Sequence, residues 1–143
     1  MDRRAEGRSI GEGGKMRSLR REQYAYKVVT AWSSGVLKAA VDLAQGYPIS
    51  MRTAGTLQTL AFSLGKRETG HGALAAAIAD WVLSKESGAP LGSFSQKEQR
   101  TAEKLLELLA TRTRAEYLAA DREAIAFADA IKVIGKAVER SAS

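Results

Sequence analysis

The sequence has no cysteine and only one histidine among its 143 residues. The absence of cysteine excludes a disulfide framework and thiolate chemistry, and it fits a protein that works in a reducing compartment. No apolar run reaches the length of about 18 residues that a membrane helix needs, and no charged segment leads into a short apolar one. We therefore expect a cytoplasmic protein with neither a membrane span nor a secretory signal.

Common catalytic motifs are absent too. The chain has no G-x-x-x-x-G-K-[ST] loop, no G-x-G-x-x-G after a strand, no H-E-x-x-H and no G-x-S-x-G. His71 has no other ligating side chains around it at metal-binding spacing, so we interpret it as a loop residue. A helix cap or an exposed face explains the carboxylates Asp80, Asp121, Glu123 and Asp129. We predict a protein that is not an enzyme and that uses no cofactor or metal.

What the sequence does contain is apolar residues at helical spacing, without the alternation typical of strands. The clearest case is Pro48 to Lys66, where apolar residues recur at i, i+3, i+4 and i+7. They are Leu57, Leu60, Ala61 and Leu64. Pro48 cannot continue an upstream helix, and Gly65 stands where a left-handed cap favours glycine. We expect this helix to be the buried centre of the fold.

Two further helices flank this one in the sequence. The first is predicted from about Ser18 to Gln45, with a bend or a close crossing with a neighbouring helix at residues 33–35, where two serines and a glycine disfavour helix. The other is predicted over Ala73–Lys85, where Trp81 shares a wide apolar face and is expected to lie in the core.

Capping patterns predict how the rest of the chain is divided. Ser95 with Glu98 forms a capping box that predicts the start of a fourth helix. Thr113 with Glu116 repeats the pattern and predicts a short helical turn, after which Asp121 is expected to be the N-cap of a final helix. The alternative is a helix that continues without a break before Thr113.

The predicted fold is therefore all-α, a single-domain bundle of about five to six helices. Its domain covers residues 16–143. Residues 1–15 are charged, glycine-rich and without apolar periodicity, so we expect them to form a disordered basic tail. The formal net charge of +6 favours acidic partners, of which nucleic acid is the most frequent.

Three blocks of sequence follow one another in a distinctive order. They read LRREQYAYK at residues 19–27, YPISMRTAGTLQTLAFSLGK at residues 47–66 and EYLAADREAIAFADAIKVIGKA at residues 116–137. In order and spacing they resemble the small helical subunit of the Cmr complex, the type III-B CRISPR RNA-guided effector. The positions that carry the resemblance are Glu22, Gln23, Ala25, Pro48, Gly55, Leu57, Leu60, Ala61, Phe62, Lys66, Trp81, Val82, Tyr117, Glu123, Ala124, Ile125 and Lys132.

Three positions depart from the family pattern. Ala54 stands where asparagine is usual, Asp121 replaces a capping threonine, and Val133 occupies the place of an arginine. Aspartate keeps the capping chemistry that threonine would provide. The valine removes one candidate RNA contact from the final helix.

The resemblance implies a non-catalytic subunit in antiviral defence. Such a subunit stacks with copies of itself beside the larger backbone subunits of the ribonucleoprotein and lines the path of guide RNA and target RNA. Lys and Arg on helical surfaces would contact phosphates rather than base edges. We predict RNA binding by Arg20, Arg21, Lys27, Arg52, Lys66, Arg67, Lys132 and Lys136.

Two other functions fit a basic helical module. A DNA-binding regulator with a helix-turn-helix is one, although the helix that begins near Gly72 offers alanines where a recognition helix should expose Arg, Asn or Gln. A purely structural adaptor, whose charge serves only solubility, is the other.

Overall fold

The computed structural model describes the backbone of residues 3–142 and the side chains of residues 14–142. Within these residues it contains seven α-helices, two short 3-10 helices and no strand. This confirms the all-α class, with the helices somewhat more divided than the predicted five to six. The α-helices are α1 (Arg3–Ala31), α2 (Ser34–Ala44), α3 (Tyr47–Ala54), α4 (Thr56–Lys66), α5 (Thr69–Val82), α6 (Ala102–Thr111) and α7 (Arg114–Ala142). The 3-10 helices are η1 (Lys85–Ser87) and η2 (Lys97–Gln99).

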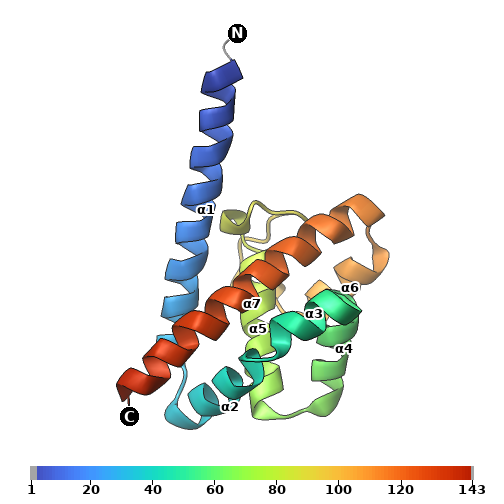
Figure 1. Cartoon of the computed structure of the whole chain (residues 1–143). Helices are drawn as coiled ribbons and strands as arrows, with labels where there is room; N and C mark the ends of the chain where they lie inside the picture. The colour runs from blue at the N-terminus through green and yellow to red at the C-terminus, as the bar shows by residue number, and fades with distance from the viewer. Residues whose placement is uncertain (1–2, 143) are drawn as a thin grey trace.

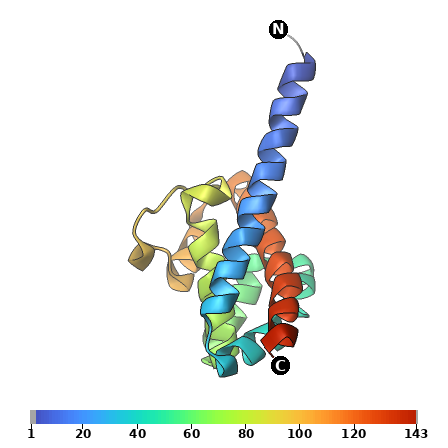
Figure 2. The same ribbon diagram turned by 90° about the vertical axis from the view of Figure 1, so that its left-hand side faces the viewer.

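Helix α5 lies at the centre of the bundle. It contacts α1, α2, α4, α6 and α7, and α7 crosses the bundle diagonally in front of it (Figure 1). The C-terminal part of helix α1 packs along α7, and its N-terminal part projects well beyond the other helices (Figures 1 and 2). In the connector between α5 and α6, η1 contacts α1, and the segment that includes η2 loops away from it (Figure 2).

The core is centred on three aromatic side chains from three helices. Trp81 of α5 stacks on Phe127 of α7, with ring centroids 5.6 Å apart and planes 10° from parallel. Tyr24 of α1 packs against both rings, at 5.2 and 5.9 Å. Trp81 and Phe127 are fully buried, so the prediction that Trp81 is a core residue is confirmed.

The predicted single helix over Pro48–Lys66 is wrong in two respects. Gly55 has φ +88, a backbone conformation that breaks the helix into α3 and α4. Gly65 lies inside α4, and the left-handed cap is Arg67, with φ 56. Nor is this segment the buried centre, because α5 takes that place and both Leu57 and Leu64 of α4 are only partly buried.

The long helix predicted from Ser18 to Gln45 is two helices. The chain leaves helical geometry at Ser33, which is extended, and α2 then begins at Ser34. The expected bend at residues 33–35 is confirmed and is a full break, because an extended residue cannot continue the helical hydrogen-bond ladder. In the other direction, α5 begins at Thr69, several residues before the predicted start.

The capping predictions have mixed outcomes. Helix α6 does not start after Ser95 as expected, because the cap is Thr101, whose hydroxyl oxygen accepts the Lys104 N–H at 3.2 Å. Thr113 does begin a helix, and its hydroxyl accepts the Glu116 N–H at 3.3 Å. That helix is α7, which runs through Asp121 without interruption, so the predicted short turn and the predicted N-cap at Asp121 are both wrong.

The alternative of a helix without a break before Thr113 is also wrong. Arg112 is extended, with ψ 167, and separates α6 from α7.

Residues 3–15 are helical and belong to α1, although the sequence predicts disorder there. The assignment of residues 1–15 as a separate basic tail stays a prediction. Residues 1 and 2 lie outside the described part of the chain. None of the helices described here is both long and apolar enough to cross a bilayer.

Candidate nucleic-acid interface

A hollow of about 460 Å³ lies between α1 and the connector that follows α5. Arg20 and Lys27 line it from α1, because residues seven apart lie on the same face of a helix. Lys85 of η1 lines it from the other side. Two of the eight predicted RNA-binding residues are therefore brought together, beside a third cation that the sequence did not single out. We call this hollow the α1 groove.

The cations of the α1 groove carry unbalanced charge. Among the described residues, no carboxylate forms an ion pair with Arg20, Lys27 or Lys85, and Glu86 is the acidic side chain in the lining. A surface with uncompensated positive charge attracts anions, and phosphate is the anion that a nucleic acid presents at regular spacing.

A second hollow of about 300 Å³ continues the positive surface along α1. It is lined by Arg17, Arg21 and Arg122, with Glu123 at its base. The Arg17 guanidinium lies close to Gly88 of the connector, within about 3 Å of the place where a β-carbon would be. Arg17 and Arg20 are three positions apart on α1, so the two hollows are lined by neighbouring turns of this helix.

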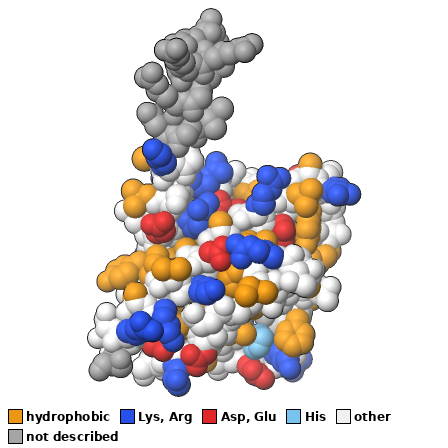
Figure 3. Space-filling view, in the orientation of Figure 1, with side chains coloured by type: hydrophobic (Ala, Val, Ile, Leu, Met, Phe, Trp, Pro, Cys, Tyr) orange, Lys and Arg blue, Asp and Glu red, His pale blue; other side chains and the backbone are white. Residues whose placement is uncertain are grey.

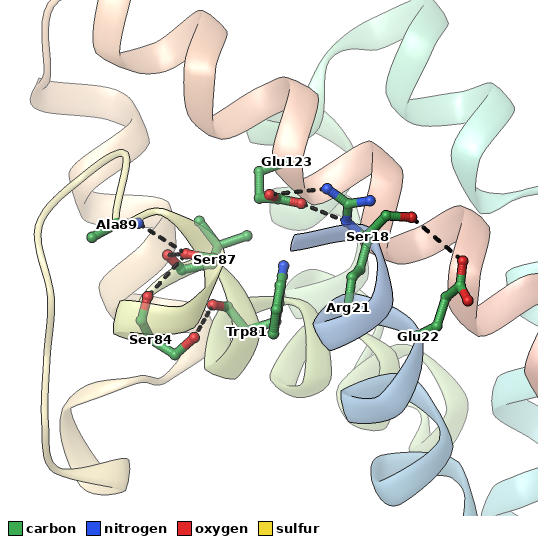
Figure 4. Close-up of polar contacts among 9 residues, drawn as sticks. Ser18, Arg21, Glu22, Trp81, Ser84, Ser87, Ala89 and Glu123 are labelled. Carbon is green, nitrogen blue, oxygen red and sulfur yellow. Dashed lines mark hydrogen bonds and ion pairs between the residues drawn. The ribbon is translucent and has the colours of Figure 1, made fainter. Parts of the chain in front are cut away.

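Arg21 lines the second hollow but is already bound. Its Nε donates to Glu123 Oε2 at 2.8 Å and its Nη2 donates to Glu123 Oε1 at 3.2 Å, which joins α1 to α7 (Figure 4). The side chains are 18% and 7% exposed. The Trp81 side chain also lies near this pair in Figure 4, and its buried indole N–H has no hydrogen-bond partner among the described residues. The ion pair makes Arg21 primarily a structural residue.

The other predicted RNA-binding residues lie elsewhere. Arg52 of α3 forms an ion pair with Asp129 of α7, and both side chains are about half exposed. Lys66 lies over the Phe62 ring, 4.9 Å from its centroid. Arg67 is the left-handed cap of α4, while Lys132 and Lys136 lie one turn apart on α7.

The structure does not bring the eight residues into one patch. On the face seen in Figure 3, Lys and Arg side chains are interspersed with Asp and Glu.

Residues of the family pattern meet at the start of α4. Asp121 of α7 accepts two hydrogen bonds on Oδ1, from the Thr56 N–H at 2.9 Å and the Thr56 hydroxyl at 2.6 Å. Tyr117, one turn earlier on α7, accepts the Leu57 N–H at 3.3 Å. A β-carbon at Gly55 would lie 2.7 Å from the Tyr117 hydroxyl oxygen. Asp121 therefore bonds the first turn of α4 and is not the cap of its own helix that the sequence had predicted.

His71 is a helical residue, so the prediction of a loop is wrong. It lies in the first turn of α5, and its Nδ1 is 2.9 Å from Ser63 Oγ. Ser63 Oγ is in turn 2.7 Å from the Tyr47 hydroxyl. Burial raises the pKa of Tyr47, against the smaller opposing effect of the Ser63 hydrogen bond, so its phenol stays protonated at neutral pH. Within the described residues no group of three potential metal ligands occurs.

Sequence reasoning missed much of the α1 groove. Lys85, Phe94 and Arg100 belong to the connector, whereas the sequence predicted Lys85 at the end of a helix and Arg100 within the helix expected after Ser95. Nothing in its local pattern shows that it returns to α1. The signal that was available is the spacing of Arg20 and Lys27, which places two cations on one helical face.

Comparison with known proteins finds a matching family and a similar solved structure. A family model described as "CRISPR-associated protein (Cas_Cmr5)" matches residues 17–138. A crystal structure of a CRISPR-associated Cmr5 family protein from Thermus thermophilus superimposes with a TM-score of 0.64 at 28% sequence identity, covering 85% of this chain and 96% of that one. No curated protein matches the chain significantly.

Proposed function

The chain belongs to the Cmr5 family of CRISPR-associated proteins, and from this membership we propose that its α1 groove contacts the RNA of a type III-B Cmr effector. Family membership makes it a small subunit of that effector in CRISPR defence. The finer proposal is a non-catalytic, cytoplasmic subunit that contacts guide and target RNA and leaves cleavage to other subunits.

The observation that carries the proposal is the charge state of the groove. Arg20, Lys27 and Lys85 converge on one hollow without ion-pair partners among the described residues. The three positive charges repel one another, and burying them without a negative partner would be unfavourable. The phosphates of an RNA backbone would supply the negative charge that compensates all three. Contacts of this kind position an RNA without reading its sequence, as a guide-directed complex requires.

A second part of the proposal concerns protein neighbours. Several large apolar side chains are exposed on α1, α3, α4 and α7, and neighbouring subunits of an assembly would cover such side chains. They include Leu19, Tyr26, Ile49, Phe62 and Val133. We propose that such surfaces contact other Cmr subunits and further copies of this chain stacked beside the backbone subunits.

The predicted cations outside the groove, apart from the ion-paired Arg21, belong to this proposal as separate RNA contacts. They are Arg52, Lys66, Arg67, Lys132 and Lys136. The Arg52 ion pair with Asp129 reduces the charge that Arg52 offers to RNA.

The test is the salt dependence of RNA binding by the full chain. Replacing Arg20 and Lys27 with glutamine should weaken binding to single-stranded RNA and lower the slope of log K against log salt by about 0.7 for each lost phosphate contact. The Arg52→Gln, Lys66→Gln double variant measures two of the cations outside the groove in the same way. Lys38→Gln removes an exposed charge of α2 that pairs with Asp42 and was not predicted to contact RNA, and it serves as the control.

Each outcome separates the functions considered. An unchanged slope for the Arg20, Lys27 variant would remove the α1 groove from RNA binding. Preference for duplex DNA would favour the regulator. No nucleic-acid binding, together with retention of the other Cmr subunits in a pull-down, would favour the structural adaptor.

A further inference from the structure

We infer that the α1 groove holds one unstacked nucleotide of single-stranded RNA, with its base against the Phe94 ring and its phosphate against the cations. This inference rests on the proposed RNA contact and adds to it a site for a base. The observation behind it is that the same hollow is lined by two aromatic side chains, Tyr24 and Phe94, as well as by Arg20, Lys27 and Lys85.

The backbone that carries the Phe94 ring is held in place before any ligand arrives. Its backbone N–H donates to the Leu83 carbonyl at 3.0 Å, and its own carbonyl accepts Arg100 Nη1 at 2.7 Å. Arg100 is itself fixed, because its Nε donates to Asp80 Oδ1 at 2.7 Å and both side chains are largely buried. A ring on a loop fixed in this way loses little conformational entropy when a base stacks on it.

The aromatic lining on the α1 side is equally fixed. Tyr24 packs on Trp81 and Phe127, so its position is set by the hydrophobic core. Single-stranded RNA is bound in proteins by this combination of aromatic faces for bases and cations for the backbone.

The dimensions favour a single nucleotide over a duplex. A hollow of about 460 Å³ lies at the lower end of the range of small-ligand sites, about 300 to 1,000 Å³. A base that is paired and stacked in a helix cannot enter such a hollow, so the nucleotide must be unpaired. Polar side chains at the edge, including Gln23, Ser93 and Ser95, can bond base edges without selecting one base.

The experiment compares RNA with a ribose-phosphate strand of equal length that carries no bases. The full chain, Phe94→Leu and Phe94→Tyr are titrated with both strands at one salt concentration. Loss of the aromatic face in Phe94→Leu should weaken RNA binding about 5- to 100-fold and leave binding of the base-free strand unchanged. Phe94→Tyr keeps the face and should bind RNA as the wild type does.

A second measurement does not depend on how the variants fold. RNA carrying 5-iodouridine is irradiated on the wild-type chain, and the crosslinked peptide is identified by mass spectrometry. We expect crosslinks at Phe94 or Tyr24, and crosslinks found only at other residues would overturn the inference.

The outcomes also separate this inference from the proposed function. If Phe94→Leu binds RNA like the wild type while Arg20→Gln, Lys27→Gln loses affinity, the base site is overturned and the phosphate contact stands. Equal losses for RNA and the base-free strand in Phe94→Leu overturn the base site as well. If the wild type binds neither strand, both proposals fail.

Discussion

On the α1 side of the molecule, Arg20 and Lys27 line a hollow without a carboxylate bonded to them, whereas on the α3–α7 side Arg52 is held by Asp129. The same contrast occurs between neighbours in sequence. Arg20 faces the groove, and Arg21 forms a two-bond ion pair with the buried Glu123. A count of positive residues therefore says little about which of them are available to a ligand.

The family pattern adds a second contrast between the two sides. Gly55, Leu57, Tyr117 and the position of Asp121 all meet where α7 caps α4. These residues hold the bundle together and do not line the α1 groove. The resemblance that identifies the family is thus carried largely by structural residues, and the groove has to be tested separately.

The largest expected change in stability separates the roles of Arg20 and Arg21. Arg21→Met should destabilise the protein by about 3 to 5 kcal/mol, because it leaves the buried Glu123 carboxylate unpaired. Urea unfolding measures this change. Arg20→Met, the matched control on the exposed face, should change stability by less than about 0.5 kcal/mol. The double variant Arg21→Met, Glu123→Leu should regain most of the stability, and a failure to do so would show that packing rather than charge causes the loss.

The next effect concerns the break between α3 and α4. Gly55→Ala should cost about 1 to 3 kcal/mol, because alanine is strained at φ +88 and its β-carbon would approach the Tyr117 hydroxyl. Gly65→Ala is the matched control inside α4, where nothing lies within 4 Å of the added carbon. It should raise stability by about 0.5 to 1 kcal/mol. Thermal unfolding measures both variants. A lower unfolding temperature for Gly55→Ala with a higher one for Gly65→Ala would support the strained break at Gly55, and shifts in the same direction would argue against it.

A smaller effect tests the cap contributed by α7. Asp121→Ala removes the acceptor of two Thr56 hydrogen bonds and should cost about 1 kcal/mol. Asp129→Ala, which breaks only the exposed pair with Arg52, should cost between about 0 and 1 kcal/mol and less than the first change. Denaturant midpoints compare the two, and an equal loss would mean that the surface pair contributes as much as the cap.

The smallest effect is a pH dependence at the start of α7. The Thr113 hydroxyl and then Arg112 hold the pKa of Glu116 below its usual value. Because the folded pKa is the lower one, the contribution to stability is present above the ordinary glutamate pKa and is lost as pH falls through the folded value. An NMR titration should show this lowered pKa, with Thr113→Val raising it and Ser141→Ala leaving it unchanged.

The sequence predicted the helices well and their interruptions poorly. Leu57, Leu60 and Leu64 keep helical spacing across α4, but nothing local shows that the helix begins only at Thr56. The reason is that the break at Gly55 is stabilised by Tyr117 and Asp121, which are 60 or more residues away in the chain. The break at Ser33 could be predicted, because the neighbouring residues are themselves poor helix formers and the local sequence indicates the end of the helix.

The candidate site was predictable on one of its two sides. Arg20 and Lys27 share a helical face by their spacing alone. Lys85 and Phe94 join them only because Leu91 is buried and Arg100 bonds Asp80, both of which fold the connector back onto the bundle. Such contacts depend on tertiary packing, which periodicity does not report.

The cap of α4 also bears on the order in which the protein forms during synthesis. The ribosome adds Thr56 long before Asp121, 65 positions later in the chain, so the first turn of this helix emerges with its amide groups still bonded to water. The hydrogen bonds of the first turn of α4 form only when α7 docks. The second half of the nascent chain must therefore be synthesised before the first half reaches its final structure.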